Sequence, residues 1–235
     1  MPDRAPLEEY QVAFTRIAAA VDAGDTDLKG LGFWRLLARV KVDPVLAHHW
    51  ADAAGEIDRR AFEAGVKLRA PVWVGNLLLG VGTVLGGVAV GIAMSTSNEL
   101  VAGLALIAAG GIWAVSVHCL AHWIVGRIVG IRFTWYFVGG PFPPRPGLKT
   151  DYATYLRAEP SARAWMHASG AIATKVAPFG ALAFWPASDA PWWSAVVLLA
   201  LGILQIVTDV LFSVRSSDWK KVKRERAIAR RQAFA

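Results

Sequence analysis

The sequence of 235 residues has a single cysteine, Cys119. One thiol excludes an intramolecular disulfide, so the fold cannot depend on such a cross-link. Charged residues are also scarce in four long apolar stretches, which contain only Lys175 and Asp209. Together with 55% hydrophobic residues and a mean hydropathy of +0.40, this scarcity of charge excludes an ordinary soluble domain.

Each of the four stretches is long enough to cross a bilayer as a helix, which requires about 20 mostly apolar residues. They run approximately over residues 71–94, 100–126, 165–186 and 191–214. The sequence therefore predicts an all-α integral membrane protein with four transmembrane helices in a membrane domain, residues 71–214.

Lys and Arg avoid two of the connections between these stretches. Ten precede the first stretch, six lie within 127–164 and eight follow the fourth stretch, whereas 95–99 and 187–190 contain none. Under the positive-inside rule, both termini and the 127–164 loop are expected in the cytoplasm. Because the charges flank membrane segments, binding to the lipid bilayer explains the net charge of +7 better than binding to nucleic acid. The basic tail, residues 215–235, is expected to contact anionic headgroups.

Residues 1–70 predict a separate helical cap on the cytoplasmic side. Leu7, Phe14, Ile17 and Val21 recur at helical spacing, and the segment at 24–27, Gly-Asp-Thr-Asp, predicts a helix end followed by a new start. A further apolar helical face follows Pro44; its members are Val45, Leu46, His49, Trp50, Ala53 and Ile57.

The second stretch contains His118 and His122, which are four residues apart and therefore share a helix face. If the predicted topology holds, His122 and His118 lie about 7 Å and about 13 Å from the cytoplasmic end of their helix, at 1.5 Å per residue. Asp209 lies about 9 Å from the same side in the fourth stretch. Two imidazoles, one carboxylate and a fourth position for water form the ligand set of a catalytic zinc site.

A different role for Asp209 is an ion pair with Lys175, which lies about 15 Å into the third stretch. The two charges would then neutralise each other, and the histidines would bond to backbone or hydroxyl groups. The residue types alone leave both interpretations open. His167, near the cytoplasmic end of the third stretch, is interpreted as an interfacial side chain.

The motif HCLAH at 118–122, followed by GRIVGIR at 126–132, resembles the motif helix of the site-2 protease family of intramembrane zinc metalloproteases. The likeness extends to the strand-like FTWYFVGG at 133–140, to HASGA at 167–171 and to a late aspartate, Asp209. The resemblance implies a zincin-like three-helix core within 100–214, one zinc ion held by His118, His122 and Asp209, and substrates that are transmembrane segments of other proteins.

Cys119 departs from this family, in which HExxH has glutamate at that position. The glutamate accepts a proton during peptide hydrolysis, so its loss is expected to lower activity about 10²- to 10⁴-fold. Three hypotheses follow: a zinc-binding pseudoenzyme with weak or absent peptidase activity, an active metalloprotease that uses an unusual base, and a non-enzymatic four-helix scaffold. Cys119, at the position of the missing base, has three interpretations: a thiol that relays protons, a thiolate that binds the metal, and a small buried apolar residue, which the sequence favours.

Overall fold

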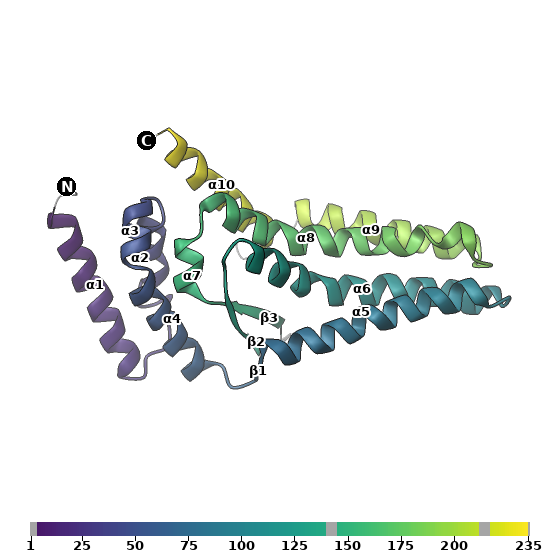
Figure 1. The fold of residues 1–235 in the computed structure, drawn as a ribbon, viewed down its shortest axis with the longest axis horizontal. Coiled ribbons are helices and arrows are strands. Elements are labelled where there is room, and N and C mark those ends of the chain that lie inside the picture. The colour runs from purple at the N-terminus through teal and green to yellow at the C-terminus, as the bar shows by residue number, and fades with distance from the viewer. Residues whose placement is uncertain (1–3, 140–144, 212–216, 235) are drawn as a thin grey trace. The chain divides into compact units, whose positions relative to one another are not determined.

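The computed structural model describes residues 4–139, 145–211 and 217–234, and most of them are helical (Figure 1). The chain divides into two compact units. The cap unit comprises Met1–Pro71, Arg127–Arg163 and Glu225–Ala235, and the helical unit comprises Val72–Gly126 and Ala164–Arg224. The cap therefore includes segments from the middle and the end of the chain in addition to the expected 1–70.

Among the described residues, the cap unit contains five helices that lie wholly within it and three strands. They are α1 (Arg4–Asp22), α2 (Phe33–Val40), α3 (Pro44–His49), α4 (Ala51–Gly65), β1 (Arg69–Pro71), β2 (Phe133–Gly139), β3 (Arg145–Thr150) and α7 (Tyr152–Arg157).

The helix boundaries in the cap follow local signals in the sequence. Helix α1 ends at Asp22, and Gly24 adopts a positive φ of 97°, as expected for the predicted stop. Asp43 caps α3 by accepting hydrogen bonds from the backbone N–H groups of Val45 and Leu46 at 2.7 and 3.2 Å. The helical face expected after Pro44 is divided between α3 and α4, because the chain turns at Trp50 with φ −92° and ψ 3°.

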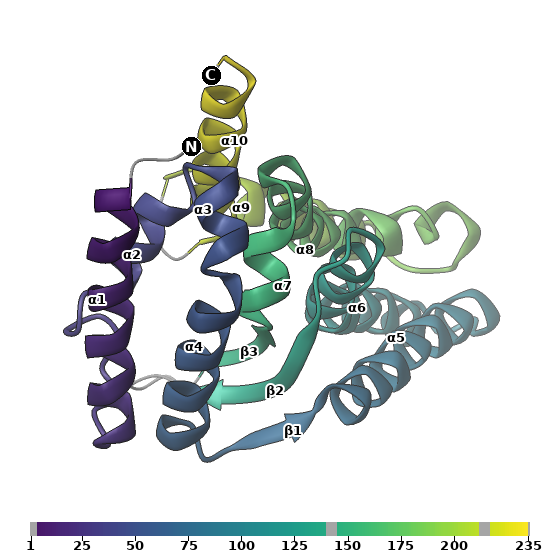
Figure 2. The same cartoon turned by 60° about the vertical axis from the view of Figure 1, so that its left-hand side comes forward.

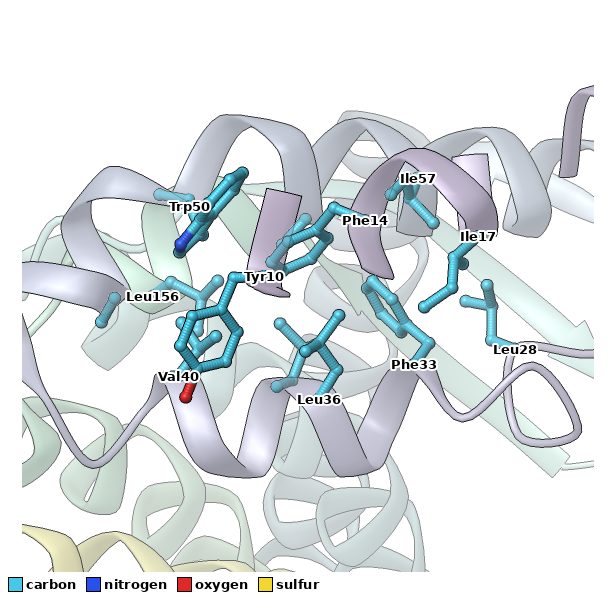
Figure 3. Close-up of a cluster of buried hydrophobic side chains, with 14 of the residues drawn as sticks. Tyr10, Phe14, Ile17, Leu28, Phe33, Leu36, Val40, Trp50, Ile57 and Leu156 are labelled. Atoms are coloured by element: carbon cyan, nitrogen blue, oxygen red, sulfur yellow. The ribbon is translucent and has the colours of Figure 1, made fainter. Parts of the chain in front are cut away.

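The apolar core of the cap lies between α1, α2, α4 and α7 (Figure 3). Phe14 of α1 stacks on Trp50 with the ring centroids 4.9 Å apart, and Phe33 and Val40 of α2 are fully buried. Leu156 of α7 joins the same cluster from the middle of the sequence. Burying each such side chain contributes about 1.5–3 kcal/mol, so this core accounts for the compactness of the cap.

A small antiparallel sheet in the order β1–β2–β3 adds to the all-α architecture predicted from the sequence (Figure 2). Arg69 pairs with Phe137, and Phe137 pairs on its other side with Gly147. The strand-like stretch after the histidine helix is therefore the central strand. Its partners β1 and β3 are too short and too polar to be distinguished from loops in the sequence.

Glu225 is the centre of a buried charge cluster in the cap. Its carboxylate forms an ion pair with Lys41. It also accepts a 2.7 Å hydrogen bond from Arg163 Nε and a 3.0 Å hydrogen bond from the Tyr155 hydroxyl. Burial raises the pKa of Glu225, but the charges of Lys41 and Arg163 outweigh it and lower the pKa below its ordinary value. One carboxylate thus neutralises cations from two distant segments of the chain.

Replacing Glu225 by Gln is expected to lower the free energy of unfolding by about 3–5 kcal/mol, because two buried cations lose their counter-charge. Denaturant unfolding of the detergent-solubilised protein measures this change. Glu9→Gln is the control, because it removes a carboxylate from the exposed pair with Arg39 and is expected to leave stability unchanged. Equal stability of the Glu225 and Glu9 variants would contradict the role assigned to the cluster.

In the described part of the chain, five long helices contribute to the helical unit. They are α5 (Val72–Ser95), α6 (Glu99–Ile128), α8 (Pro160–Leu182), α9 (Trp192–Leu211) and α10 (Asp218–Ala233), with a short 3₁₀ turn at Trp185–Ala187; α6, α8 and α10 each continue into the cap unit at one end. Three of them, α5, α6 and α9, are long and apolar enough to span a membrane.

Helix α8 corresponds to the third predicted span but is not among the helices of the described chain that qualify by length and apolarity. Polar side chains interrupt its apolar sequence, including His167, Thr174 and Lys175. The end of the fourth predicted span, residues 212–214, lies outside the described residues.

Glycines allow α5 and α6 to pack closely within the chain, where the two helices lie side by side in both ribbon views (Figures 1 and 2). A Cβ atom at Gly82 would lie 2.6 Å from Ser116 Oγ, and one at Gly86 would overlap the Trp113 indole. The indole N–H donates a 3.0 Å hydrogen bond to the carbonyl oxygen of Thr83, back on α5. The Gly82-x-x-x-Gly86 spacing therefore serves an intramolecular contact.

Gly86→Ala is expected to destabilise the protein by about 1–3 kcal/mol, because the added methyl group displaces Trp113. Gly87→Ala is the matched control: a Cβ there meets nothing within 4 Å, so stability should stay the same or rise slightly. Thermal unfolding in detergent compares the two variants. If both behave alike, close approach at Gly86 does not determine the packing.

Candidate metal centre

Helix α6 brings His118 and His122 onto one face, as their spacing predicts. Their ring centroids are 4.7 Å apart and the ring planes are nearly perpendicular, at 87°. The side chain of His122 is mostly buried, whereas that of His118 is about one-third exposed, at 35%. The pair therefore lies at the edge of the helix packing, with His118 on the accessible side.

Backbone and hydroxyl groups of α8 determine the tautomers of both histidines. His122 Nδ1 lies 2.6 Å from the carbonyl oxygen of Met166, and His118 Nδ1 lies 3.1 Å from that of Gly170 and 2.8 Å from Thr174 Oγ1. A carbonyl oxygen can only accept a hydrogen bond, and the Thr174 hydroxyl already donates its hydrogen to the carbonyl oxygen of Gly170. Each Nδ1 must therefore carry the proton, and in the neutral ring each Nε2 presents a lone pair.

Asp218, the first residue of α10, supplies a carboxylate to the same place. Its Oδ2 atom lies 3.2 Å from His122 Nε2 and 3.6 Å from His118 Nε2. The three ligand atoms all lie within 4.8 Å of one another. The α10 helix is held there by Val222 and Trp219, which pack against Ala164 and Ala168 of α8.

These separations fit a single metal ion. Two ligands bound at about 2.0–2.1 Å with tetrahedral angles are about 3.3 Å apart, close to the two measured His–Asp distances. Two lone pairs that face a carboxylate oxygen repel one another unless a cation or a proton lies between them. The Nδ1–H bonds to α8 are the outer-shell contacts that orient metal-binding histidines.

The other carboxylate oxygen of Asp218 has different partners. Lys221 Nζ lies 3.0 Å from Oδ1, and His167 Nδ1 lies 3.9 Å from it. Burial raises the pKa of Asp218, but the contacts with His122 and Lys221 outweigh it, so the pKa lies well below its usual range. Asp218 is accordingly an ionised carboxylate, the form that binds metals.

The structure places Asp209, the carboxylate expected to complete the site, elsewhere. Asp209 of α9 forms an ion pair with Lys175 of α8, the alternative that the sequence left open. Lys175 also donates a 3.2 Å hydrogen bond to the carbonyl oxygen of Ala171. The third member of the cluster is thus Asp218 and not Asp209, because the ammonium of the partly buried Lys175 already neutralises Asp209.

Sequence reasoning missed Asp218 because it lies beyond the apolar stretches, among the basic residues of the tail. One signal was present: Asp218 is the sole carboxylate between Asp209 and Glu225. An acidic residue followed by a basic amphipathic segment is also typical of a helix start.

Cys119 and His167 lie near the cluster without belonging to it. Cys119 follows His118 directly, so it points about 100° away around the helix, and it is half-buried. His167 is buried within α8, where the sequence predicted an interfacial position, and its ring centroid lies 6.4 Å from that of His122.

Comparison with known proteins found no matching family model, no related curated protein and no similar solved structure.

Gly170 is a sensitive position beside the cluster, because a Cβ atom there would overlap the His122 ring at Nε2. If the cluster holds a metal ion, Gly170→Ala is expected to weaken its binding about 10- to 100-fold by displacing that nitrogen. Gly111→Ala is the control, since a Cβ at Gly111 of α6 meets nothing within 4 Å. Competition with a chromophoric chelator measures both affinities, and an unchanged affinity in the Gly170 variant would contradict this account of His122.

Proposed function

We propose that this protein is a site-2-protease-like intramembrane metalloprotein that holds one zinc ion through His118, His122 and Asp218, with weak or absent peptidase activity. The observation that carries the proposal is the convergence of one ring nitrogen from each histidine and one carboxylate oxygen within 4.8 Å. Two imidazoles and a carboxylate suit zinc, and three protein ligands leave a position for a substrate oxygen.

The proposal differs from the family resemblance in where its carboxylate comes from. Asp218 begins α10, nine residues after Asp209 of α9. The metal's role in a related enzyme would be to polarise a carbonyl and to lower the pKa of water. What the chain itself supplies is two oriented imidazoles and an ionised carboxylate, while position 119 offers a thiol in place of the expected carboxylate base.

The proposed membrane arrangement retains four spans, with α8 as the third and both termini in the cytoplasm. The polar groups of α8 support its inclusion, because they are satisfied by protein. Thr174 accepts from His118, and Lys175 pairs with Asp209. Polar residues that are paired inside a bundle are tolerated at membrane depth. The basic flanks of the spans are the second support.

A second candidate function is an active intramembrane metalloprotease, and the position of His167 favours it. Its Nδ1 lies 3.9 Å from Asp218 Oδ1, close enough to the cluster for proton transfer through one water. In either case the substrates would be transmembrane segments of other proteins. The active enzyme would cleave them, whereas the pseudoenzyme would only bind them.

Zinc content of the detergent-purified protein tests the proposal. We expect about one zinc per chain, and loss of the zinc in His118→Ala and Asp218→Asn, which remove ligands. The matched control is the double variant Lys175→Met with Asp209→Asn, which removes the neighbouring ion pair as a unit and is expected to retain zinc. A wild-type protein without zinc would leave the non-enzymatic helical scaffold as the better explanation.

Peptidase activity separates the two metal-dependent candidates. Chelator-sensitive cleavage of a helical membrane peptide by the wild type, lost in His167→Ala, favours the active enzyme. Cleavage that appears only after Cys119→Glu shows that a proton acceptor was the missing part.

A further inference from the structure

The two oxygens of Asp218 lie in contrasting surroundings. Oδ2 faces the Nε2 atoms of His118 and His122, whereas Oδ1 lies 3.0 Å from the ammonium of Lys221. Lys221 is three residues after Asp218 on α10, the spacing at which helix side chains meet. The contact is half-sheltered, with 17% of the Asp218 side chain and 34% of the Lys221 side chain exposed.

The orientation of this carboxylate determines how many metal positions it fills. Carboxylates bind metals through one oxygen or through both. Two imidazoles and one oxygen leave the fourth tetrahedral position open, as in catalytic sites, whereas an ion that both oxygens bind has one more protein ligand atom and less room for an external ligand. A group that holds Oδ1 away from the ion therefore keeps that position accessible.

We propose that Lys221 is a positioning residue that keeps Asp218 bound through Oδ2 alone, so that one coordination position stays open for an external oxygen or nitrogen ligand. The inference rests on the proposed function, because it requires a metal at the cluster. A hydrogen-bonded ammonium competes with the ion for Oδ1, and such outer-shell partners orient first ligands in metal sites.

The alternative is an ordinary surface ion pair, which contributes about 0–1 kcal/mol and leaves the metal chemistry unchanged. Lys220 offers a matched comparison. It neighbours Lys221, carries the same charge, is exposed, and forms no ion pair within the described part of the chain. Lys220→Met and Lys221→Met thus remove the same charge from one turn, but only the second frees Oδ1.

The experiment uses full-length protein loaded with Co²⁺, whose visible spectrum reports changes in its ligands, and titrates it with imidazole. This probe is neutral, so loss of a nearby charge does not itself weaken its binding. We expect the wild type, Lys220→Met and Lys221→Arg to bind imidazole alike. Lys221→Met is expected to keep Co²⁺ but to bind imidazole about tenfold or more weakly, because Oδ1 then also binds the ion and competes with imidazole.

Imidazole affinity in Lys221→Met equal to that of the wild type would overturn the inference. Loss of Co²⁺ from Lys221→Met alone would also overturn it, because Lys221 would then be needed for metal binding itself. These outcomes leave the proposed function standing. A wild type that binds neither Co²⁺ nor zinc would refute the proposed function and the inference together.

Discussion

The candidate site depends on the hydrogen bonds that two imidazole N–H groups of α6 donate to α8. The Nδ1–H group of His122 donates a hydrogen bond to the carbonyl oxygen of Met166, and that of His118 donates to the carbonyl oxygen of Gly170 and to Thr174 Oγ1. These bonds direct both Nε2 lone pairs toward Asp218. Without them the rings would be free to turn, and the spacing of the histidines on α6 would not by itself make a cation site.

Close helix packing makes those bonds possible. The backbone of α8 reaches the His122 ring because Gly170 has no side chain to keep the two apart. On the other side of α6, Gly82 and Gly86 of α5 accommodate Ser116 and Trp113. Small residues therefore bring polar groups of different helices within bonding distance, which is how polar groups are satisfied in an apolar surrounding.

Charge is handled in the same way in both units, by pairing at the points where segments distant in sequence meet. In the cap, Glu225 pairs with Lys41 and Arg163, and Lys149 reaches the buried Asp58 at 2.6 Å. In the helical unit, Asp209 pairs with Lys175, and Asp218 faces the histidines and Lys221. Asp209 and Asp218 are both acidic residues near the end of the chain, but they have different partners. Asp209 forms an ion pair, whereas Asp218 belongs to the candidate metal centre.

Periodicity and composition alone determined the helical character, the three apolar helices α5, α6 and α9, and the common face of His118 and His122. These properties depend on residues near one another in sequence, which local patterns describe. Tertiary structure alone decided that Asp218 replaces Asp209 beside the histidines, that α8 supplies the acceptors for both rings, and that the cap incorporates Leu156 and Glu225. Those outcomes depend on which distant segments pack together, and equal depths along two helices do not reveal which side chains face each other.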